Sequence, residues 1–538
     1  MKMKLGILAL MVVCASNPVH SKTYYIDFQT GSDDSIGSKS HPWKHCPGML
    51  GTSGKSKAYS CPGGDTFTFK GGAVWDSSCI PWTISGKGGN VFTIDTTWYT
   101  GASYSRPKIN GMNKPVGSVV VHYNQSHNIF NGFEIYNYRA LPGAGDPPCF
   151  DIYGSYYCTF SNMYVHNWHA DGWTNTDGAV FQCYYDSVLT ITRDTAVGVD
   201  SGGSLYFSVG YDDHTTISYN KLSGGTNGGI MPHGGGKNME ISYNDISNIW
   251  QGHFQQSAHT DGIYVFGGSG SMHHNKVHDC ATMAIMFQGS NNYLVYDNAV
   301  YNINGTSAMG DATNGVTCLE CTLSIYNNYI EGIYSHGRNQ GGPSAIGGLK
   351  LINNIFTGGS IYITDTIHKL IIDHNLYKLD STTNPSYITF FEQTINRFQA
   401  RAKGWDSTSV FSTKLYLDTN GKPLNLNSPI IHKGKNLHAL PDSTKPGFLL
   451  DLENKSRPIK LNWSIGGYEP DSSLTTSVVE PKNKLLTQSV IPITKKSVLM
   501  TYMNSKFHRP NSLFVYNLEG RKILSQSMAS GIGIYNNN

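Results

Sequence analysis

The chain has 538 residues, of which only 14% are charged, and its formal net charge is +3. This nearly balanced charge argues against the broad basic surface of a nucleic-acid-binding protein, so we expect no nucleic-acid partner. With 59 Gly and 33 Tyr, the composition favours β-structure over a mainly helical fold.

Residues 1–21 are typical of a secretion signal. Lys2 and Lys4 supply a positive region, an apolar run ends at Cys14, and a plausible cleavage site precedes Lys22. The apolar run is too short to span a bilayer. No other stretch is long and apolar enough to do so. We therefore expect an exported protein without a membrane span, which is secreted or held at the cell surface.

The cysteines bear on stability outside the cell. The sequence has ten, and loss of Cys14 with the signal leaves nine, which could form disulfides in an exported protein. Cys149 and Cys158 could close a short loop. Cys318 and Cys321 have a zinc-like spacing, but no second CxxC pair accompanies them. A local disulfide or two buried thiols is therefore the better interpretation.

The opening of the mature chain carries a first family signal. Residues 23–49 combine a short strand pattern, a Gly/Ser/Asp loop and a Pro-Trp turn. This opening resembles that of many secreted right-handed parallel β-helix enzymes that act on polysaccharides. In that family the segment caps the first coil, so the resemblance implies an architecture rather than one activity.

One short phrase recurs through the body of the chain: alternating apolar residues, then Asn, then apolar-x-apolar. Its copies align on Asn131, Asn162, Asn220, Asn244, Asn275, Asn298, Asn328, Asn354 and Asn375, and Arg193 fills the Asn position of one further copy. The alternation indicates short strands with one buried face. An Asn at the same point of every coil can adopt a left-handed turn conformation and hydrogen-bond its counterparts above and below.

The spacing of this phrase selects the architecture. Steps of 21 to 31 residues are too short for a four-stranded propeller blade. The sequence therefore predicts an all-β fold, a right-handed parallel β-helix solenoid of about ten or more coils. We place this domain at residues 22–470.

The C-terminal part departs from the repeat. The segments "LNLNSPIIHKGKNL" (424–437), "DLENKSRP" and "SIGGYEP" (464–470) resemble the closing segment of the same β-helix group, which ends in a turn and a strand. Residues 471–505 have the Ser/Thr/Lys-rich composition of a linker. The stretch "SLFVYNLEGRKILSQ" (512–526) resembles the C-terminal sorting module of the type IX secretion route. That resemblance implies a small β module at 506–538 that engages the secretion machinery.

Polar side chains are concentrated between His166 and His278. The strands "DGAVFQ", "GSLYFS", "GGIMPH", "DGIYVF" and "MAIMFQ" are expected on five consecutive coils, where their outward side chains would line a groove for an extended polysaccharide. Their last positions, expected to align, are Gln182, Ser208, His233, Phe266 and Gln288. Coils stack about 4.8 Å apart, so carboxylates of neighbouring coils can reach the separations that glycoside hydrolysis uses.

The order "NTDG", "DD", "HG" along the chain is similar to that of the polygalacturonase-type hydrolases of this fold. The resemblance implies Asp177, Asp212, Asp213 and His233 as catalytic residues. Asp261, in a second TDG phrase, is a further carboxylate candidate at a neighbouring subsite. Residues expected to bind the polysaccharide are Asp171, Trp173, Gln182, Asp200, Lys237, His259 and Gln288. We expect a monomeric glycoside hydrolase that needs no cofactor and acts on a plant or algal polysaccharide.

Two alternatives stay open. A polysaccharide lyase would use Ca²⁺, held by Asp177, Asp200, Asp212 and Asp213, with Lys237 or His233 as base. A non-catalytic carbohydrate-binding or adhesin-like surface protein is the other alternative, although such a protein should spread its polar groups rather than cluster them. Each Asp-Gly phrase could also be no more than a turn signal, and Trp168 could stack on sugar rings or pack in the core.

Overall fold

A computed structural model describes residues 21–476, except 141–147, 169–178, 199–204, 225–227, 250–260, 281–282, 290–291, 304–313, 338–347, 365–368, 381 and 391–392. Beyond these it describes 492–493, 497–498, 512–516 and 522–527. The chain forms two compact units, Met1–Thr476 and Ser477–Asn538.

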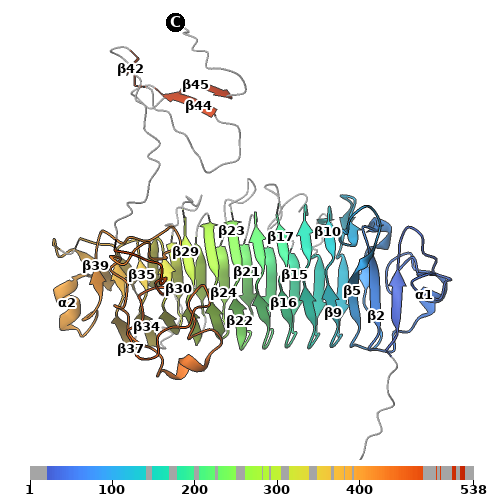
Figure 1. Cartoon of the computed structure of the whole chain (residues 1–538), viewed down its shortest axis with the longest axis horizontal. Coiled ribbons are helices and arrows are strands. Elements are labelled where there is room, and N and C mark those ends of the chain that lie inside the picture. The colour runs from blue at the N-terminus through green and yellow to red at the C-terminus, as the bar shows by residue number, and fades with distance from the viewer. Residues whose placement is uncertain are drawn as a thin grey trace, which may run out of the picture. The chain divides into compact units, whose positions relative to one another are not determined.

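The first unit is built from three parallel sheets of 13 strands each (Figure 1). Sheet A contains β1 (Thr23–Ile26), β2 (Thr66–Gly71), β5 (Val91–Tyr99), β9 (Ile129–Asn131), β13 (Thr159–Ser161), β16 (Thr190–Thr192), β19 (Thr216–Ser218), β22 (Met239–Ser242), β25 (Gly270–His273), β28 (Tyr293–Tyr296), β31 (Leu323–Tyr326), β34 (Gly348–Ile352) and β37 (Lys369–Asp373). Sheet B contains β3 (Val74–Trp75), β6 (Lys108–Asn110), β10 (Glu134–Tyr136), β14 (Tyr164–His166), β17 (Thr195–Val197), β20 (Lys221–Ser223), β23 (Asp245–Ile249), β26 (Lys276–Cys280), β29 (Ala299–Tyr301), β32 (Tyr329–Ile330), β35 (Ile355–Phe356), β38 (Leu376–Tyr377) and β41 (Val410–Phe411).

Sheet C contains β4 (Trp82–Thr83), β8 (Val120–Tyr123), β12 (Phe150–Tyr153), β15 (Ala179–Tyr184), β18 (Leu205–Gly210), β21 (Gly228–His233), β24 (Asp261–Phe266), β27 (Ile285–Gln288), β30 (Asn314–Leu319), β33 (Ile333–Gly337), β36 (Ile361–Ile363), β39 (Ser386–Phe390) and β40 (Gln393–Asn396). Only the last pair, β39 and β40, is antiparallel within this sheet. Short helices are α1 (Gly54–Ala58), α2 (Arg397–Ala402) and the 3₁₀ turns η1 (Ser77–Cys79) and η2 (Pro441–Thr444), and β7 (Pro115–Val116) pairs with β11 (Arg139–Ala140).

Each coil passes through sheet C, then sheet A, then sheet B, before it returns to sheet C one step further along (Figure 1). Most turns from C to A and from A to B are short, although the connections after β5 and β33 are longer, whereas the B-to-C connections vary in length throughout. This arrangement confirms the predicted right-handed parallel β-helix, and the variable connections explain the uneven repeat spacing.

Apolar side chains from the inward faces fill the axis of the coil. In the N-terminal half, the rings of Phe92, Phe130 and Phe160 stack from coil to coil at 4.5 and 5.2 Å between centroids. Further along the axis, isoleucines such as Ile191 and Ile217 take the same place in sheet A and are fully buried. Burial of these side chains is the main driving force for stacking coils, because a single coil cannot cover its own apolar face.

A ladder of asparagines joins the turns between sheets A and B. Its members are Asn220, Asn244, Asn275, Asn298, Asn328, Asn354 and Asn375, all buried. Each member except the last donates its backbone N–H and its side-chain amide to the Oδ1 of the next, at 2.9–3.2 Å. The same amide also donates to a sheet A carbonyl of the preceding coil, such as that of Ile191. The predicted contacts between stacked Asn residues are confirmed for this part.

Two details of the predicted ladder are wrong. Asn162 and Arg193 occupy the position before the ladder, with φ of 55° and 59°, and Asp194 is the ladder residue of that coil because its Oδ1 accepts the N–H of Met163 and its N–H bonds to Asn220. Asn131 lies at the end of β9, and its Oδ1 accepts a hydrogen bond from the side-chain amide of Asn162 at 2.6 Å, so the predicted contact between these two residues is present. The left-handed conformation also belongs to the residue before each ladder Asn. A ladder side chain has to point into the turn, whereas the left-handed residue directs its side chain away from it.

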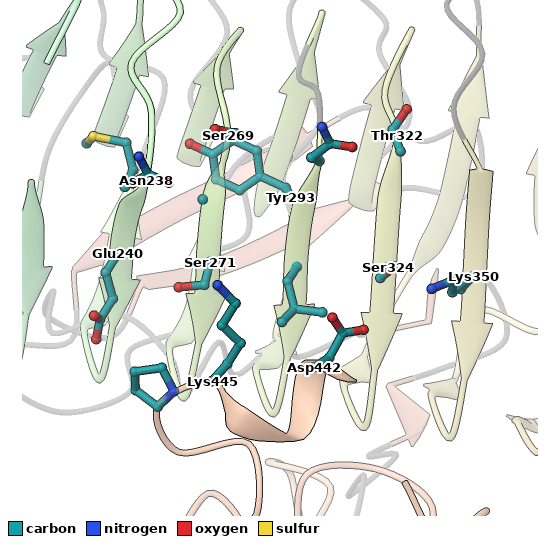
Figure 2. A pocket seen from close by; sticks show the side chains of 15 residues that line it. Asn238, Glu240, Ser269, Ser271, Tyr293, Thr322, Ser324, Lys350, Asp442 and Lys445 are labelled. Carbon is teal, nitrogen blue, oxygen red and sulfur yellow. The ribbon is translucent and has the colours of Figure 1, made fainter. Parts of the chain in front are cut away.

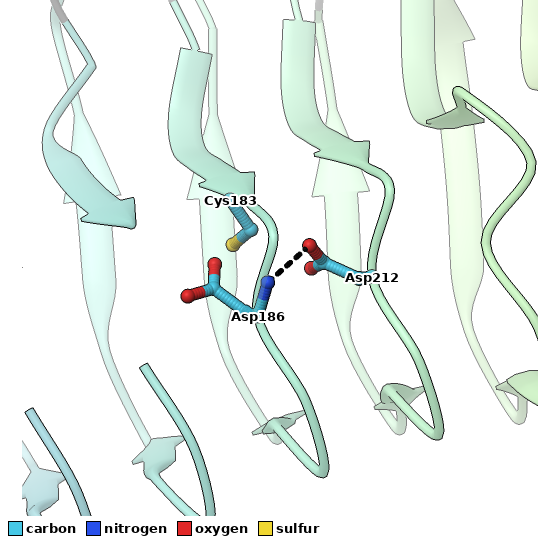
Figure 3. Close-up of side chains that lie close together, drawn as sticks. All are labelled: Cys183, Asp186 and Asp212. Atoms are coloured by element: carbon cyan, nitrogen blue, oxygen red, sulfur yellow. Dashed lines mark hydrogen bonds between the residues drawn. The ribbon is translucent and has the colours of Figure 1, made fainter. Parts of the chain in front are cut away.

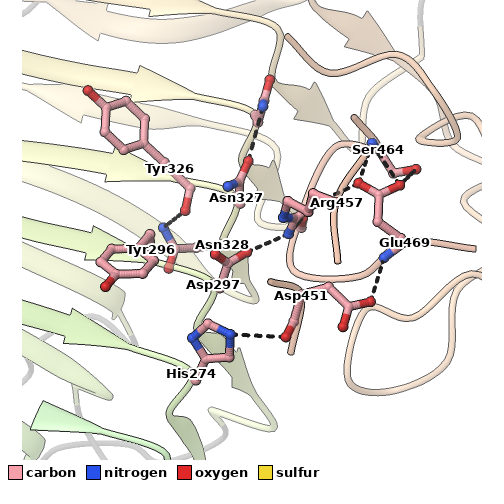
Figure 4. Close-up of polar contacts among 12 residues, drawn as sticks. His274, Tyr296, Asp297, Tyr326, Asn327, Asn328, Asp451, Arg457, Ser464 and Glu469 are labelled. Carbon is pink, nitrogen blue, oxygen red and sulfur yellow. Dashed lines mark hydrogen bonds and ion pairs between the residues drawn. The ribbon is translucent and has the colours of Figure 1, made fainter. Parts of the chain in front are cut away.

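The closing segment packs back onto the helix through a buried ion pair (Figure 4). Arg457 forms ion pairs with Asp297, which is in the turn after β28, and with Glu469 at 2.8 Å. Glu469 also accepts the backbone N–H of Ser464 at 3.0 Å. Around it, apolar side chains such as Phe448 and Trp463 of this segment cover sheets A and B. The "RP" and "GGYE" motifs thus contact each other through Arg457 and Glu469, but 464–470 does not form the strand that the resemblance implied.

The remaining features concern cysteines, membrane spans and the second unit. All nine cysteines after residue 21 are buried thiols that form no disulfides, so Cys149 and Cys158 are not bonded to each other, and neither are Cys318 and Cys321. Among the described helices, none is long and apolar enough to cross a membrane.

The described residues of the second unit include two antiparallel strand pairs. Strand β42 (Pro492–Ile493) pairs with β43 (Ser497–Val498), and β44 (Ser512–Tyr516) pairs with β45 (Lys522–Ser527).

Asp194 generates a prediction about stability and pH. Burial raises the pKa of its carboxyl well above the ordinary value of 3.8, and the opposing effect of Arg106 is smaller. A carboxyl group whose pKa is higher in the folded than in the unfolded state stabilises the fold fully only when the pH is below its ordinary pKa. This stabilisation is lost as the pH rises through the folded-state pKa. We therefore expect Asp194→Asn to have a larger free energy of unfolding than the parent at about pH 8, and the difference to vanish near pH 4.

Urea denaturation of both proteins across this pH range provides the measurement, and the difference between them isolates Asp194 from the other buried acids. An unchanged difference at all pH values would show that Asp194 does not hold a proton in the folded protein.

Candidate functional site

The outward face of sheet C carries two rows of aligned side chains. Alternation along each strand directs every second side chain away from the axis, as the half-buried Gln182 and Tyr184 between buried neighbours of β15 show. The first row contains Val121, Asp151, Gln182, Ser208 and Met231, and the second contains Tyr123, Tyr153, Tyr184, Gly210 and His233. These rows place the predicted Gln182 and His233 on one surface.

The expected alignment of strand ends is correct in two places and wrong in one. Gln182 pairs with Ser208, and Phe266 pairs with Gln288, as predicted. His233 pairs with Gly210, however, two residues beyond Ser208. Strand β18 continues for two residues past the predicted end before the chain turns. A shift of two residues keeps the side chain on the same face, so His233 still points outward.

Five rings form a continuous line beside these strands, which we call the aromatic row: Tyr123, Tyr153, Tyr185, Tyr211 and His233. Successive ring centroids lie 6.0, 5.6, 4.9 and 6.5 Å apart. Tyr185 and Tyr211 are stacked within 7°, and they are 56% and 52% exposed. Large aromatic faces that stay in solvent across four coil steps offer a surface for apolar ring faces of a ligand.

His233 ends the aromatic row in a partly closed environment. Its Nε2 lies 3.2 Å from the Oγ of Ser208, and its ring lies edge-on to Tyr184 at 5.2 Å. Gly210 makes room for both rings, because a Cβ there would lie 2.5 Å from Cε1 of His233 and 2.7 Å from Tyr184. Burial lowers the pKa of His233. A neutral imidazole on the outward face of the sheet can accept a proton from a ligand.

At the other end of the row lies a carboxylate that the sequence analysis did not single out. Asp151 accepts hydrogen bonds from the hydroxyl groups of Tyr123, at 2.5 Å, and Ser118, at 3.3 Å. Burial and this carboxylate together raise the pKa of Tyr123 to about 12. Asp151 and Gln182 are neighbours in the first row and supply acceptors and a donor for sugar hydroxyl groups.

The pair Asp212 and Asp213 is split by the turn that follows β18. Asp212 is 1% exposed and accepts the backbone N–H of Asp186 at 2.9 Å, whereas the side chain of Asp213 is 48% exposed and lies 3.2 Å from Nδ1 of His214. Contrary to expectation, Asp212 thus faces the core and not a polysaccharide. Because the two carboxylates lie on opposite sides of the turn, they do not join one Ca²⁺ site either.

Three other predicted residues have described positions. Asp261, the first residue of β24, is buried, and burial together with this charge raises the pKa of Tyr264 to about 12. Gln288 accepts a hydrogen bond from the hydroxyl of Tyr264 at 2.5 Å. Lys237 is exposed and pairs through its backbone with Asp213 of the preceding coil. Gln288 and Lys237 are therefore accessible, whereas Asp261 is not.

The other predicted residues lie outside the described part of the chain: Asp171, Trp173, Asp177, Asp200 and His259. All five fall, by their position in the chain, between a strand of sheet B and the next strand of sheet C. Trp168 is described and is buried, with its ring parallel to that of Tyr138 at 6.4 Å. The alternative that Trp168 packs in the core is therefore confirmed.

A polar hollow lies on the outward face of sheet A, where the closing segment passes over this sheet (Figure 2). Its volume is about 500 Å³, and its lining includes Glu240, Ser271, Ser324, Lys350, Asp442 and Lys445. Glu240 faces the imidazole of His273 at 3.5 Å, and this contact lowers the pKa of Glu240. None of the predicted site residues lines this hollow, so it is separate from the surface on sheet C.

Comparison with known proteins agrees with the fold. A family model described as a right handed beta helix region matches residues 207–376. No curated protein of similar sequence was found. Similar solved structures include a rhamnogalacturonan lyase (TM-score 0.44, 13% identity, 68% of this chain and 89% of that chain covered). They also include a pectate lyase (TM-score 0.44, 13% identity, 84% of this chain and 97% of that chain covered). A lacto-N-biosidase from Eubacterium ramulus is a third (TM-score 0.45, 12% identity, 65% of this chain and 67% of that chain covered).

Tyr185 and Tyr211 lie in turns between sheets C and A, so an alignment of the strands alone does not bring them together. The chain reads Tyr-Tyr-Asp at 184–186 and Gly-Tyr-Asp at 210–212, so an alignment on the C-to-A turn would have superposed Tyr185 and Tyr211. The same alignment would have shown Asp186 and Asp212 as equivalent positions.

The environment of His233 leads to a second prediction. Since burial lowers its pKa, we expect its imidazole to titrate below the ordinary value of 6.5 and to be neutral at neutral pH. Histidine ring signals in an NMR titration provide the measurement, with His233→Gln used to assign the resonance. A midpoint at or above the ordinary value would contradict the burial seen here.

Proposed function

We propose that this protein binds an extended polysaccharide along the aromatic row of sheet C and cleaves it near His233. The aromatic row is the observation that carries the proposal. Its rings follow the helix axis over four coil steps, a length of about 19 Å, which suits several sugar units of one chain. Aromatic side chains bind the apolar faces of such rings, while Asp151, Gln182 and Ser208 beside them can pair with hydroxyl groups.

Hydrolysis is the reaction that the sequence favours. It needs two carboxyl groups, about 5 Å apart for retention or 6.5–9.5 Å apart for inversion. Asp213 is the exposed member of its pair, and Asp177 precedes β15, which carries Gln182 and Tyr184. In this proposal Asp177 and Asp213 act as acid and base, and Asp212 takes no part because its carboxyl group is buried.

β-Elimination is the second candidate, and the surroundings of His233 favour it. A lyase base has to remove the proton from the carbon beside a uronate carboxyl group, and His233 is neutral and half-buried. The hydroxyl of Tyr184, next to its ring, would then protonate the departing glycosidic oxygen as the C–O bond breaks and the C=C bond forms. Lys237, or a Ca²⁺ ion held by Asp177 and Asp200, would balance the charge of the uronate.

The ends of the chain fit a protein that acts outside the cell. The signal-like residues 1–21 and the sorting-like segment around β44 and β45 support export within this proposal, as does a polymeric substrate. A single compact β-helix unit that carries the whole aromatic row is compatible with action as a monomer.

A panel of neutral, sulfated and uronate polysaccharides tests the proposal, with reducing ends and ultraviolet absorbance of unsaturated products followed in parallel. Hydrolysis yields reducing ends alone, and we then expect Asp177→Asn and Asp213→Asn each to lower the rate by about 10²–10⁴-fold. Elimination also yields the unsaturated product, and the same loss is then expected for His233→Gln. Binding without cleavage of any polymer would indicate a carbohydrate-binding surface protein instead.

A glycine pair provides a matched control for the position of His233. Gly210→Ala should displace the rings of His233 and Tyr184 and lower the rate, since its Cβ would lie 2.5 Å from the imidazole. Gly337 occupies an equivalent outward position on β33, and its Cβ would meet side chains only at 3.2 and 3.3 Å. Gly337→Ala should therefore leave the rate nearly unchanged.

A pair of tyrosine stacks tests the binding surface itself. We expect Tyr185→Ala and Tyr211→Ala each to weaken polysaccharide binding about two- to tenfold, because an aromatic contact contributes about 0.5–1.5 kcal/mol. Calorimetric titration with a cleavage-deficient protein provides the measurement. The control is Tyr219→Ala. Tyr219 stacks on Tyr243 at 4.6 Å between ring centroids, but it lies in the turn between sheets A and B and does not belong to the aromatic row. Equal losses in all three variants would rule out the aromatic row as the binding surface.

A further inference from the structure

Three ionisable side chains meet in the core beneath the aromatic row (Figure 3). They are Cys183 of β15, Asp186 of the turn that follows it, and Asp212 of the equivalent turn in the next coil. Their exposures are 0%, 2% and 1%. One potential ligand atom from each lies within 4.8 Å of the other two. We refer to these residues as the Cys-Asp-Asp cluster.

Each carboxylate of the cluster is held by one oxygen and leaves the other free. Oδ1 of Asp186 accepts the backbone N–H of Ser155 at 2.5 Å, and Oδ1 of Asp212 accepts the N–H of Asp186 at 2.9 Å. Within the described part of the chain, neither Oδ2 has a hydrogen-bond partner. A buried polar atom without a partner is costly, so these two oxygens point to something that binds between them.

Among the described residues, no cationic side chain balances the cluster. The charges that act on its three groups belong to the cluster itself and to Asp151, which is acidic as well. His122, which contacts the hydroxyl of Ser155 at 3.0 Å, has its pKa lowered to about 3 by burial and is neutral. Burial, assisted by Asp212, raises the pKa of Asp186 to about 8, and burial raises that of Asp212 to about 7. The cluster therefore has to hold either protons or a cation.

We propose that the Cys-Asp-Asp cluster is a structural site for a divalent metal ion of the zinc class, bound by Sγ of Cys183 and Oδ2 of Asp186 and Asp212. Ligands at about 2.3 Å for sulfur and 2.0–2.2 Å for oxygen lie at most about 4.5 Å apart around one ion, so small side-chain movements suffice. The N–H groups on the two Oδ1 atoms orient the carboxylates, as partners of ligands do in metal sites.

The ligand set selects the kind of ion. Ca²⁺ requires six to eight oxygen ligands, which one thiol and two carboxylates do not supply. Zinc accepts mixed sulfur and oxygen ligands in fourfold coordination, which leaves one position for a further ligand. When the ion binds, the thiol of Cys183 and any protonated carboxylate release their protons to solvent.

Such an ion would join two successive coils directly beneath the substrate surface. Cys183 and Asp186 flank Tyr184 and Tyr185, and Asp212 follows Tyr211. The ion would therefore fix the spacing of the two stacked tyrosines of the aromatic row. This role goes beyond the proposed function and does not depend on which reaction the protein catalyses.

The test uses the full chain, purified without a histidine tag and dialysed against a chelator. Titration with Zn²⁺ should show one tight equivalent per chain and raise the midpoint of thermal unfolding, and Co²⁺ should produce the charge-transfer absorption of a thiolate ligand. Cys183→Ser and Asp212→Asn should each weaken Zn²⁺ binding at least about 100-fold, since loss of even an outer-shell partner costs 10–100-fold. Cys149→Ser is the control, because Cys149 is equally buried but contacts Tyr138 rather than the acids.

Two outcomes would overturn the proposal. Zn²⁺ binding that persists in Cys183→Ser and Asp212→Asn would place the ion elsewhere on the chain. Absence of binding to the parent, together with a gain in stability of Asp186→Asn as the pH rises, would show that the cluster holds protons. The asparagine side chain keeps the oxygen that accepts the N–H of Ser155, so this variant separates loss of a ligand from loss of the fold.

Discussion

Buried turns impose the central constraint on this β-helix: their backbone N–H groups face the core, where no water can bind them. In the turn between sheets A and B, an Asn of the next coil accepts each of these N–H groups, and its amide nitrogen donates in turn. The ladder therefore satisfies donors and acceptors together. Because it requires one Asn at one point per coil, it fixes where each turn occurs and keeps the strands of sheets A and B in register.

The same constraint acts where the accepting residue is an Asp. Asp194 continues the Asn ladder, and Asp186 and Asp212 form a shorter ladder in the turn between sheets C and A. An aspartate reproduces the acceptor but replaces the donating amide nitrogen by a second oxygen. That oxygen then needs a proton or a cation. In the second ladder it has Cys183 and another carboxylate as neighbours, which is why we assign it a metal ion.

Sheet C is the face of the β-helix that we assign to function. The closing segment covers sheets A and B of the C-terminal coils, anchored by Arg457 against Asp297 and Glu469. Replacement of Asp297 by an apolar residue would leave a buried guanidinium with one partner fewer, an arrangement that is strongly destabilising. Sheet C of the N-terminal half keeps exposed tyrosines on its outer side. Among the residues that the sequence associates with catalysis, Asp213 follows strand β18 and His233 ends strand β21 of this sheet.

The sequence by itself determined the right-handed β-helix, five strands of sheet C and the ladder from Asn220 to Asn375, because alternation and an Asn at fixed intervals are local patterns that each coil must repeat. It also identified Gln182 and His233 as neighbours of one surface. Only the tertiary structure showed that Asp212 faces the core while Asp213 faces solvent, and that Arg193 yields the ladder position to Asp194. The side chains of adjacent residues point in different directions. Which of them points into the core depends on where the turn begins relative to the neighbouring coil. The stacked coils decide this, because one residue of offset in a turn exchanges the buried and exposed faces.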